Sequence, residues 1–115
     1  MDEKLSKALE FANYTRTFED QKKIIKEKYF DSLVHYTYGG QFSVTQTLIT
    51  FVNIISSKAE TAILIDDNNN PIKIDDLNKF YEDIVDLYFQ ASNIYYTELH
   101  EMKSKRSIEK LVEYE

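Results

Sequence analysis

The sequence contains no cysteine, and it has only two glycines and one proline in 115 residues. Without cysteine the chain can form no disulfide, no thiolate nucleophile and no zinc–thiolate site. Glycine and proline are the residues that most often interrupt helices and strands. Their scarcity predicts a chain that consists mostly of regular secondary structure.

Long apolar segments are also missing. The best candidate, Leu48–Ile55, is interrupted by polar residues and falls well short of the ~18 apolar residues that a membrane span needs. Met1 leads directly into Asp2, Glu3 and Lys4, without the apolar core of a secretory signal. We therefore expect no membrane partner and a cytoplasmic location.

Positive charge is in short supply, because the formal net charge is -6 and the pI is about 4.9. An acidic chain is a poor match for nucleic acid, whose phosphates are bound mainly by Lys and Arg, so no nucleic-acid partner is expected. The local basic groups could meet phosphate or an acidic partner, but they alternate with Asp and Glu, which favours solubilising charge. These groups are Lys22, Lys23, Lys26, Lys28, Lys103, Lys105 and Arg106.

Two long helical patterns dominate what is present. Apolar residues recur at intervals of three, four and seven from about residue 4 to 37, where Gly39-Gly40 would end the helix. A second pattern, capped by Asp75 or Asp76, runs from about 75 to 104. A short helix over about 107–113 would follow a break near Ser104. At ~1.5 Å per residue the long helices would span roughly 50 and 45 Å.

The segment between these helices predicts a shorter helix and a hairpin. Ser43-Val44-Thr45-Gln46 has the S-x-x-Q form of a capping box and would begin a helix over about 43–57. Two apolar runs flank the polar turn Asp66–Asn70 and predict a β-hairpin over about 61–74. The sequence thus predicts one domain, 1–115, of predominantly helical α+β class, with the long helices packed antiparallel.

Motifs for chemistry are absent: there is no G-x-S-x-G, no P-loop and no G-x-G-x-x-G. The acidic turn invites a calcium interpretation, but an EF-hand loop starting at Asp66 would have Pro71 at position six and Leu77 at position twelve. These positions require Gly and Glu, so a polar turn is favoured.

Other candidate ligands also have structural interpretations. Glu82, Asp83 and Asp86 share a helical face but lack a His at i+3 or i+4, so we interpret them as a solvated face. His35 and His100 have no second His at i+4 and are expected on the surface. We predict no catalytic, cofactor-binding or metal-binding residues, and no enzyme.

Aromatic residues are the remaining anomaly, with nine Tyr and seven Phe. Amphipathic tyrosines are common at protein interfaces. The apolar residues near Tyr95, Leu99 and Met102 would extend past the shorter helix and the hairpin that lie between the long helices in the sequence. We expect them to lack cover within the chain, which predicts self-association as a dimer or larger oligomer. The clusters of interest are Tyr36, Tyr38 and Phe42 around the glycine pair, and Tyr95 and Tyr96 late in the last helix.

Three strings together resemble a family of small proteins of contractile-tailed phages of cyanobacteria. They are Tyr36-x-x-Gly39-Gly40-Gln41-Phe42-x-Val44-Thr45, then Leu64–Asn68, then Pro71-Ile72-x-Ile74-x-Asp76-Leu77. The resemblance covers nearly the whole chain. It implies that the gene lies among those for head morphogenesis. Some members of the family are labelled prohead core protein, and the resemblance implies no catalytic residues.

The functional expectation is therefore a non-enzymatic phage protein that acts in virion or prohead assembly through helix-mediated contacts. Its partners would be itself and a phage structural protein, in the host cytoplasm or in the virion. The alternative is a small regulatory protein that binds a host enzyme or complex.

Overall fold

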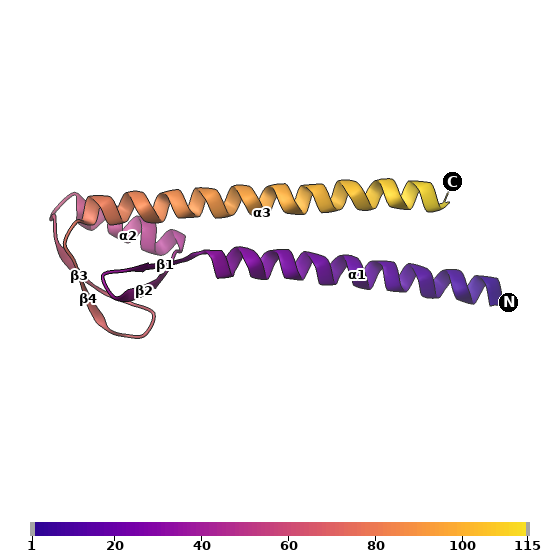
Figure 1. The fold of residues 1–115 in the computed structure, drawn as a ribbon, viewed down its shortest axis with the longest axis horizontal. Coiled ribbons are helices and arrows are strands. Elements are labelled where there is room, and N and C mark those ends of the chain that lie inside the picture. The colour runs from indigo at the N-terminus through magenta and orange to yellow at the C-terminus, as the bar shows by residue number, and fades with distance from the viewer. Residues whose placement is uncertain (1, 115) are drawn as a thin grey trace. The chain divides into compact units, whose positions relative to one another are not determined.

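A computed structural model describes the backbone of residues 2–114 and the side chains of residues 2–106. The described chain contains three helices and two separate two-stranded antiparallel sheets (Figure 1), which confirms the predominantly helical α+β class. In chain order the elements are α1 (Asp2–Ser32), β1 (Val34–Thr37), β2 (Gly40–Ser43), α2 (Gln46–Ser56), β3 (Ala62–Ile65), β4 (Pro71–Ile74) and α3 (Leu77–Tyr114).

The chain divides into two compact units. Unit 1 combines Met1–Lys28 with Tyr95–Glu115, and unit 2 is Tyr29–Ile94. The long helices α1 and α3 each contribute to both units. The two hairpins and α2 belong to unit 2 alone.

The first helix ends earlier than predicted. The expectation of a helix to residue 37 is wrong, because α1 ends at Ser32 and Val34–Ser43 forms the hairpin β1–β2. Tyr38 and Gly39 both have positive φ, +52° and +79°, which is the conformation of a two-residue hairpin turn. Gly39 therefore turns a hairpin and does not end a helix.

Gly40 has a packing role that the sequence did not reveal. A Cβ added at Gly40 would lie 2.8 Å from Cγ1 of Ile72 in β4. Only a residue without a side chain lets the first hairpin approach the second this closely.

The start of α2 also differs from the prediction. Ser43 is the last residue of β2, where it pairs with Val34, so it does not cap a helix. The N-cap is Thr45, whose hydroxyl oxygen accepts a hydrogen bond from the backbone N–H of Leu48 at 3.1 Å. The prediction of a capping box at Ser43 is therefore wrong, and α2 covers Gln46–Ser56 rather than 43–57.

The predicted hairpin of about 61–74 is confirmed as β3–β4, with Leu64 opposite Ile72. Its turn is closed by hydrogen bonds from Asp66 N–H to Asn70 C=O and from Asn69 N–H to Asp66 C=O, both 3.0 Å. Asn69 adopts the left-handed conformation, with φ +62°, which Asn tolerates better than most residues.

The last helix begins as predicted and ends later. The carboxylate of Asp76 accepts a hydrogen bond from Lys79 N–H at 3.1 Å, which confirms a cap at this position. The helix then continues to Tyr114. The predicted end at residue 104 and the separate helix over 107–113 are therefore wrong. No Gly or Pro follows Pro71 in the sequence, so nothing strong enough to end the helix is present.

Unit 2 contains the hydrophobic core. Its buried apolar side chains come from both hairpins, α2 and α3, and they pack as one cluster with an edge-to-face contact between Phe42 and Phe80, 5.2 Å between centroids. The members are Leu33, Phe42, Val44, Val52, Leu64, Ile74, Leu77, Phe80, Ile84 and Ala91.

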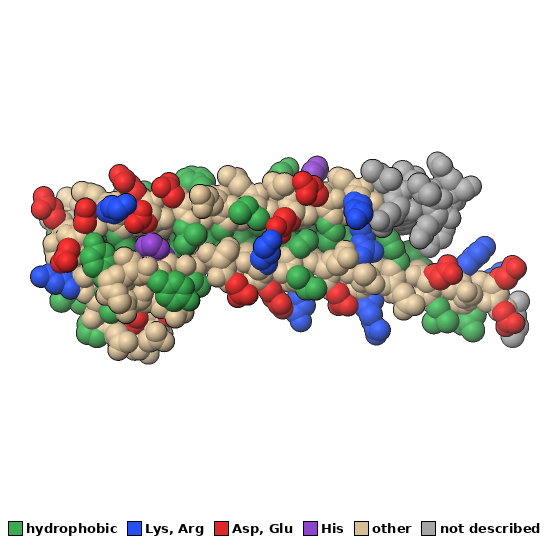
Figure 2. Space-filling view, viewed as in Figure 1, with side chains coloured by type: hydrophobic (Ala, Val, Ile, Leu, Met, Phe, Trp, Pro, Cys, Tyr) green, Lys and Arg blue, Asp and Glu red, His purple; other side chains and the backbone are tan. Residues whose placement is uncertain are grey.

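Unit 1 consists of two helical segments that run antiparallel, as predicted. Lys28 forms an ion pair with Glu98, and the Arg106 guanidinium donates two hydrogen bonds to the Gln21 side-chain oxygen at 2.8 and 3.1 Å. Arg106 also stacks over the Tyr14 ring, 5.0 Å from its centroid. No residue of α1 is buried, and acidic and basic side chains alternate along its surface (Figure 2).

Candidate functional site

One stretch of the chain carries no formal charge, although 30% of all residues are charged. No Asp, Glu, Lys or Arg occurs between Asp31 and Lys58. This stretch contains β1, β2 and α2, all in unit 2. This uncharged stretch is a sequence feature of the candidate site that the search for motifs missed.

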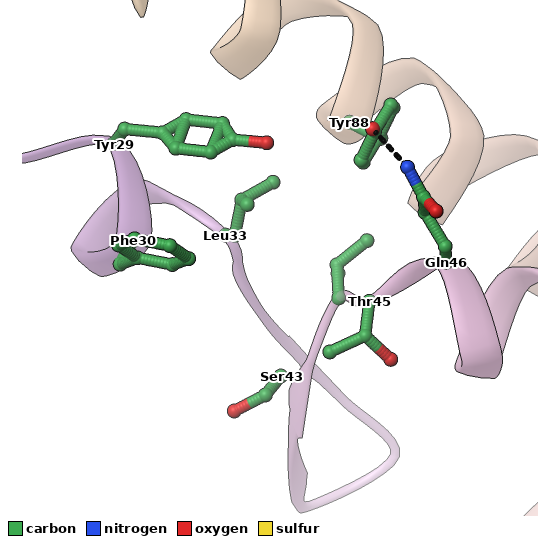
Figure 3. Close-up of a pocket in the computed structure, with 8 residues that line it drawn as sticks. Tyr29, Phe30, Leu33, Ser43, Thr45, Gln46 and Tyr88 are labelled. Atoms are coloured by element: carbon green, nitrogen blue, oxygen red, sulfur yellow. Dashed lines mark hydrogen bonds between the residues drawn. The ribbon is translucent and has the colours of Figure 1, made fainter. Parts of the chain in front are cut away.

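A pocket of about 450 Å³ opens in unit 2 beside this stretch (Figure 3). Its walls come from the end of α1, the junction between β2 and α2, and one residue of α3. None of the described residues that line it is charged. The lining residues are Tyr29, Phe30, Leu33, Ser43, Val44, Thr45, Gln46 and Tyr88.

The polar groups of the pocket are engaged in hydrogen bonds within the protein. The Gln46 side-chain amide donates to the Tyr88 hydroxyl at 2.9 Å (Figure 3). The Ser43 hydroxyl donates to the Asp67 carboxylate at 2.7 Å, and Thr45 caps α2. These bonds fix the walls, and the rings of Phe30 and Tyr88 remain as contact surface. Such a pocket suits an apolar side chain better than a reacting polar substrate.

A second hollow of about 400 Å³ lies along α2. The residues after Gln46 that line it follow the spacing i, i+3, i+4, i+7, so they occupy one face of the helix. Phe51 and Ile54 on this face are 50% and 52% exposed, while Val52 on the opposite face is buried in the core. The lining residues are Gln46, Thr47, Thr50, Phe51 and Ile54.

The two hollows adjoin at Gln46, which lines both of them. Eight described residues line the pocket and five line the α2 hollow; because Gln46 belongs to both, the area contains twelve described residues. We call these twelve residues the uncharged surface. It has a recess at one end and a protruding aromatic ring, Phe51, at the other.

The acidic turn Asp66–Asn70 joins the two hairpins through hydrogen bonds. Asp66 accepts hydrogen bonds from the backbone N–H groups of Asn70 and Asn68, at 2.8 and 3.0 Å, and of Gln41 in β2, at 3.1 Å. The backbone bond from Asn70 is the main cause that lowers the pKa of Asp66 below its ordinary value of 3.8, and partial desolvation opposes it.

Asp67 completes this connection. Its carboxylate accepts from Ser43 N–H at 3.1 Å, and its own N–H donates to the Gln41 carbonyl at 2.8 Å. The outer edge of β2 is therefore covered by the turn, and the carboxylates that a calcium site would need serve as backbone acceptors.

His35 does not lie on the surface of a helix, so that prediction is wrong. It lies in β1 opposite Phe42, and its ring is 5.9 Å from that of Phe80 in the core. Its Nε2 atom is buried and has no hydrogen-bond partner among the described residues. The strand alternation, missed in the sequence, directs this side chain inward.

The other polar candidates are exposed or paired. Lys79 bonds to Asp83 at 3.4 Å, Glu82 and Asp86 are exposed, and His100 stacks on Tyr96. Within the described side chains, no group of three or more His, Asp or Glu residues could hold a metal ion. Among the same residues, no helix has the length and apolarity needed to cross a membrane.

The basic cluster of α1 lines a hollow of about 370 Å³ in unit 1 together with Glu19 and Tyr95. Lys23 is 4.0 Å from Glu27, so charges of both signs meet there. Tyr95, Leu99 and Met102 are half-buried in unit 1. The expectation that these three residues lack cover within the chain is therefore wrong, whereas Tyr96 beside them is 71% exposed.

Comparison of the chain with protein-family models, with curated proteins and with solved structures gives no match.

Proposed function

We propose that this chain is a non-enzymatic protein that acts by binding other protein chains through the uncharged surface of unit 2. The observation that carries the proposal is the outer face of α2, where Phe51 and Ile54 are half exposed beside an uncharged pocket. Contiguous exposed apolar areas of this kind mark interaction sites. Aromatic anchors next to pockets contribute most of the binding energy at such sites.

The chemistry of the surface indicates the chemistry of its partner. With no charge among the described residues that line it, ion pairs cannot supply the affinity, so burial of apolar area must. The spacing along α2 suits an apolar helix laid against it, because side chains at i, i+3, i+4 and i+7 form one stripe. Binding through this surface should change little between low and moderate salt.

The biological setting proposed here is virion or prohead assembly, with a phage structural protein among the partners. The resemblance of Tyr36–Thr45, Leu64–Asn68 and Pro71–Leu77 to cyanobacterial phage proteins supports this setting. The geometry of unit 2 supports the binding role itself.

Site-specific photo-crosslinking in the cells that make the chain tests the binding role. A photo-reactive residue at Thr47, in the middle of the uncharged surface, should attach to a protein chain. The same group at Lys73, an exposed position of β4 outside that surface, is the control and should give little product. Adding Phe51→Asp should abolish the Thr47 product while the circular dichroism spectrum stays helical. Equal labelling at both positions, or labelling that survives Phe51→Asp, would exclude this surface as the binding site.

A further inference from the structure

The uncharged surface has complementary parts. Gln46 lines the pocket, and Phe51 follows it five residues later in α2, a rise of about 7.5 Å along the helix. A recess beside a protrusion on one surface is the arrangement that a two-fold contact requires, since each copy then offers what the other needs.

Building on the proposed binding role, we infer that the partner seated on this surface is a second copy of the same chain. In this dimer two α2 helices cross antiparallel, and Phe51 of each copy enters the pocket lined by Phe30 and Tyr88 of the other.

The register of α2 is compatible with this pairing. An antiparallel crossing that places Phe51 opposite Gln46 of the second copy also places Thr47 opposite Thr50. These are small side chains, which allow helix axes to approach to roughly 8–10 Å. Both threonines line the hollow along α2 and are exposed.

Electrostatics favours a second copy at this position over contact at other surfaces. Two copies with a net charge of -6 each repel one another. Contact through the uncharged surface sets none of its described lining residues, all uncharged, against a like charge of the same surface on the other copy. The chain itself supplies a partner surface that is equally free of charge.

The size of the surface sets the expected affinity. The twelve described lining residues, of which Leu33 and Val44 are buried, are fewer than the roughly 20–30 per side of a standard stable interface. Association should therefore be weak, with a dissociation constant on the order of micromolar to tens of micromolar.

Sedimentation velocity of the full chain from about 1 to 200 µM tests the inference. Wild-type protein should shift from the 13.6 kDa monomer towards a dimer across this range. Phe51→Ser should weaken dimerisation by at least about tenfold, since it removes the anchoring ring. Thr47→Arg changes an exposed position and should keep the fold. It should also weaken the dimer, because it places two like charges close together on either side of the two-fold axis. Ile63→Ser is the matched control: Ile63 is 65% exposed but lies in β3 outside the surface, so the dimer should persist.

Oxidative crosslinking gives an independent readout, because the sequence has no native cysteine. In this register Thr47 of one copy lies opposite Thr50 of the other, so a mixture of Thr47→Cys and Thr50→Cys chains should form a disulfide-linked dimer, and Lys73→Cys should not. A monomer throughout the concentration range, or a dimer that Phe51→Ser and Thr47→Arg leave intact, would overturn the inference. If the purified chain is monomeric while Thr47 still crosslinks to another protein in cells, the binding role stands and the second copy is excluded.

Discussion

Unit 1 and unit 2 are built from the same two long helices and differ in what covers them. In unit 2 the helical segments pack against two hairpins and α2, and ten apolar side chains are buried. In unit 1 two helical segments cover only each other, and none of its described side chains is among those buried ten. Two helices shield one stripe each, so most of each helix stays in water.

The contacts within unit 1 are correspondingly polar. Arg106, Tyr14 and Gln21 hold the segments together through hydrogen bonds and a cation–π contact at exposed or half-exposed positions. Exposed pairs such as Lys28–Glu98 contribute typically about 0–1 kcal/mol. Helix length is therefore a poor guide to stability in this molecule, because the shorter elements provide the core.

Hydrogen exchange should show the largest difference between the units. Amides of α3 before residue 94 and of β3 and β4 should need opening free energies that approach the global value, roughly 5–15 kcal/mol for a native domain. Amides of α1 before residue 28 should open at only a small fraction of that value. Exchange measured by mass spectrometry on the native protein resolves the two regions. Uniform protection along α1 and α3 would contradict the comparison.

Substitution of equivalent residues provides the second test. Ile84→Ala removes a side chain that is 0% exposed in unit 2 and should cost about 2–5 kcal/mol in the free energy of unfolding. Ile24→Ala is the matched change in unit 1, where the side chain is 63% exposed, and it should stay within about 0.5 kcal/mol of wild type. Denaturant titration followed by circular dichroism measures both, and similar losses would show that unit 1 has a core of its own.

Acid should act on unit 2 through Asp66. Because backbone N–H groups lower the pKa of this carboxyl in the folded state, its contribution to stability is complete above the unfolded pKa. That contribution is lost as the pH falls below about 3.8 through the lower folded pKa. Asp66→Asn should lower the unfolding temperature at pH 7 and flatten its decline in acid. Asp86→Asn, an exposed change on α3, is the control and should leave the acid profile unchanged.

The smallest expected effect is a gain in stability. His35 has a buried Nε2 without a partner among the described residues and faces the core beside Phe80. His35→Phe replaces this unpaired polar atom with apolar surface of similar shape and should stabilise the protein by about 1 kcal/mol. Thermal unfolding measures the change. A loss of stability would contradict the interpretation of Nε2 as an unpaired buried atom.

The parts of the fold that the sequence predicts are those where local signals agree. The stripe of Leu77, Phe80 and Ile84 with the cap at Asp76, and the turn at Asp66–Asn70 between apolar runs, define α3 and β3–β4. The hairpin β1–β2 was missed because Leu33 and Tyr36 also fit helical spacing. Its formation depends on contacts distant in the chain, from Asp66, Asp67 and Ile72.

The candidate site was predictable only in part. The stretch without charge between Asp31 and Lys58 is visible in the sequence. The pocket is not, because it forms only when the end of α1 and the start of α2 meet Tyr88. No local pattern encodes the convergence of three segments so far apart in the chain.

The cover that Asp66 and Asp67 place over β2 has a consequence for synthesis on the ribosome. Ser43 emerges from the ribosome 24 residues before Asp67, which at roughly 5–20 residues per second leaves about one to five seconds between them. During this interval the outer edge of β2 presents unpaired backbone groups to other nascent chains. Slower elongation while these residues emerge would prolong the exposure, and faster elongation would shorten it.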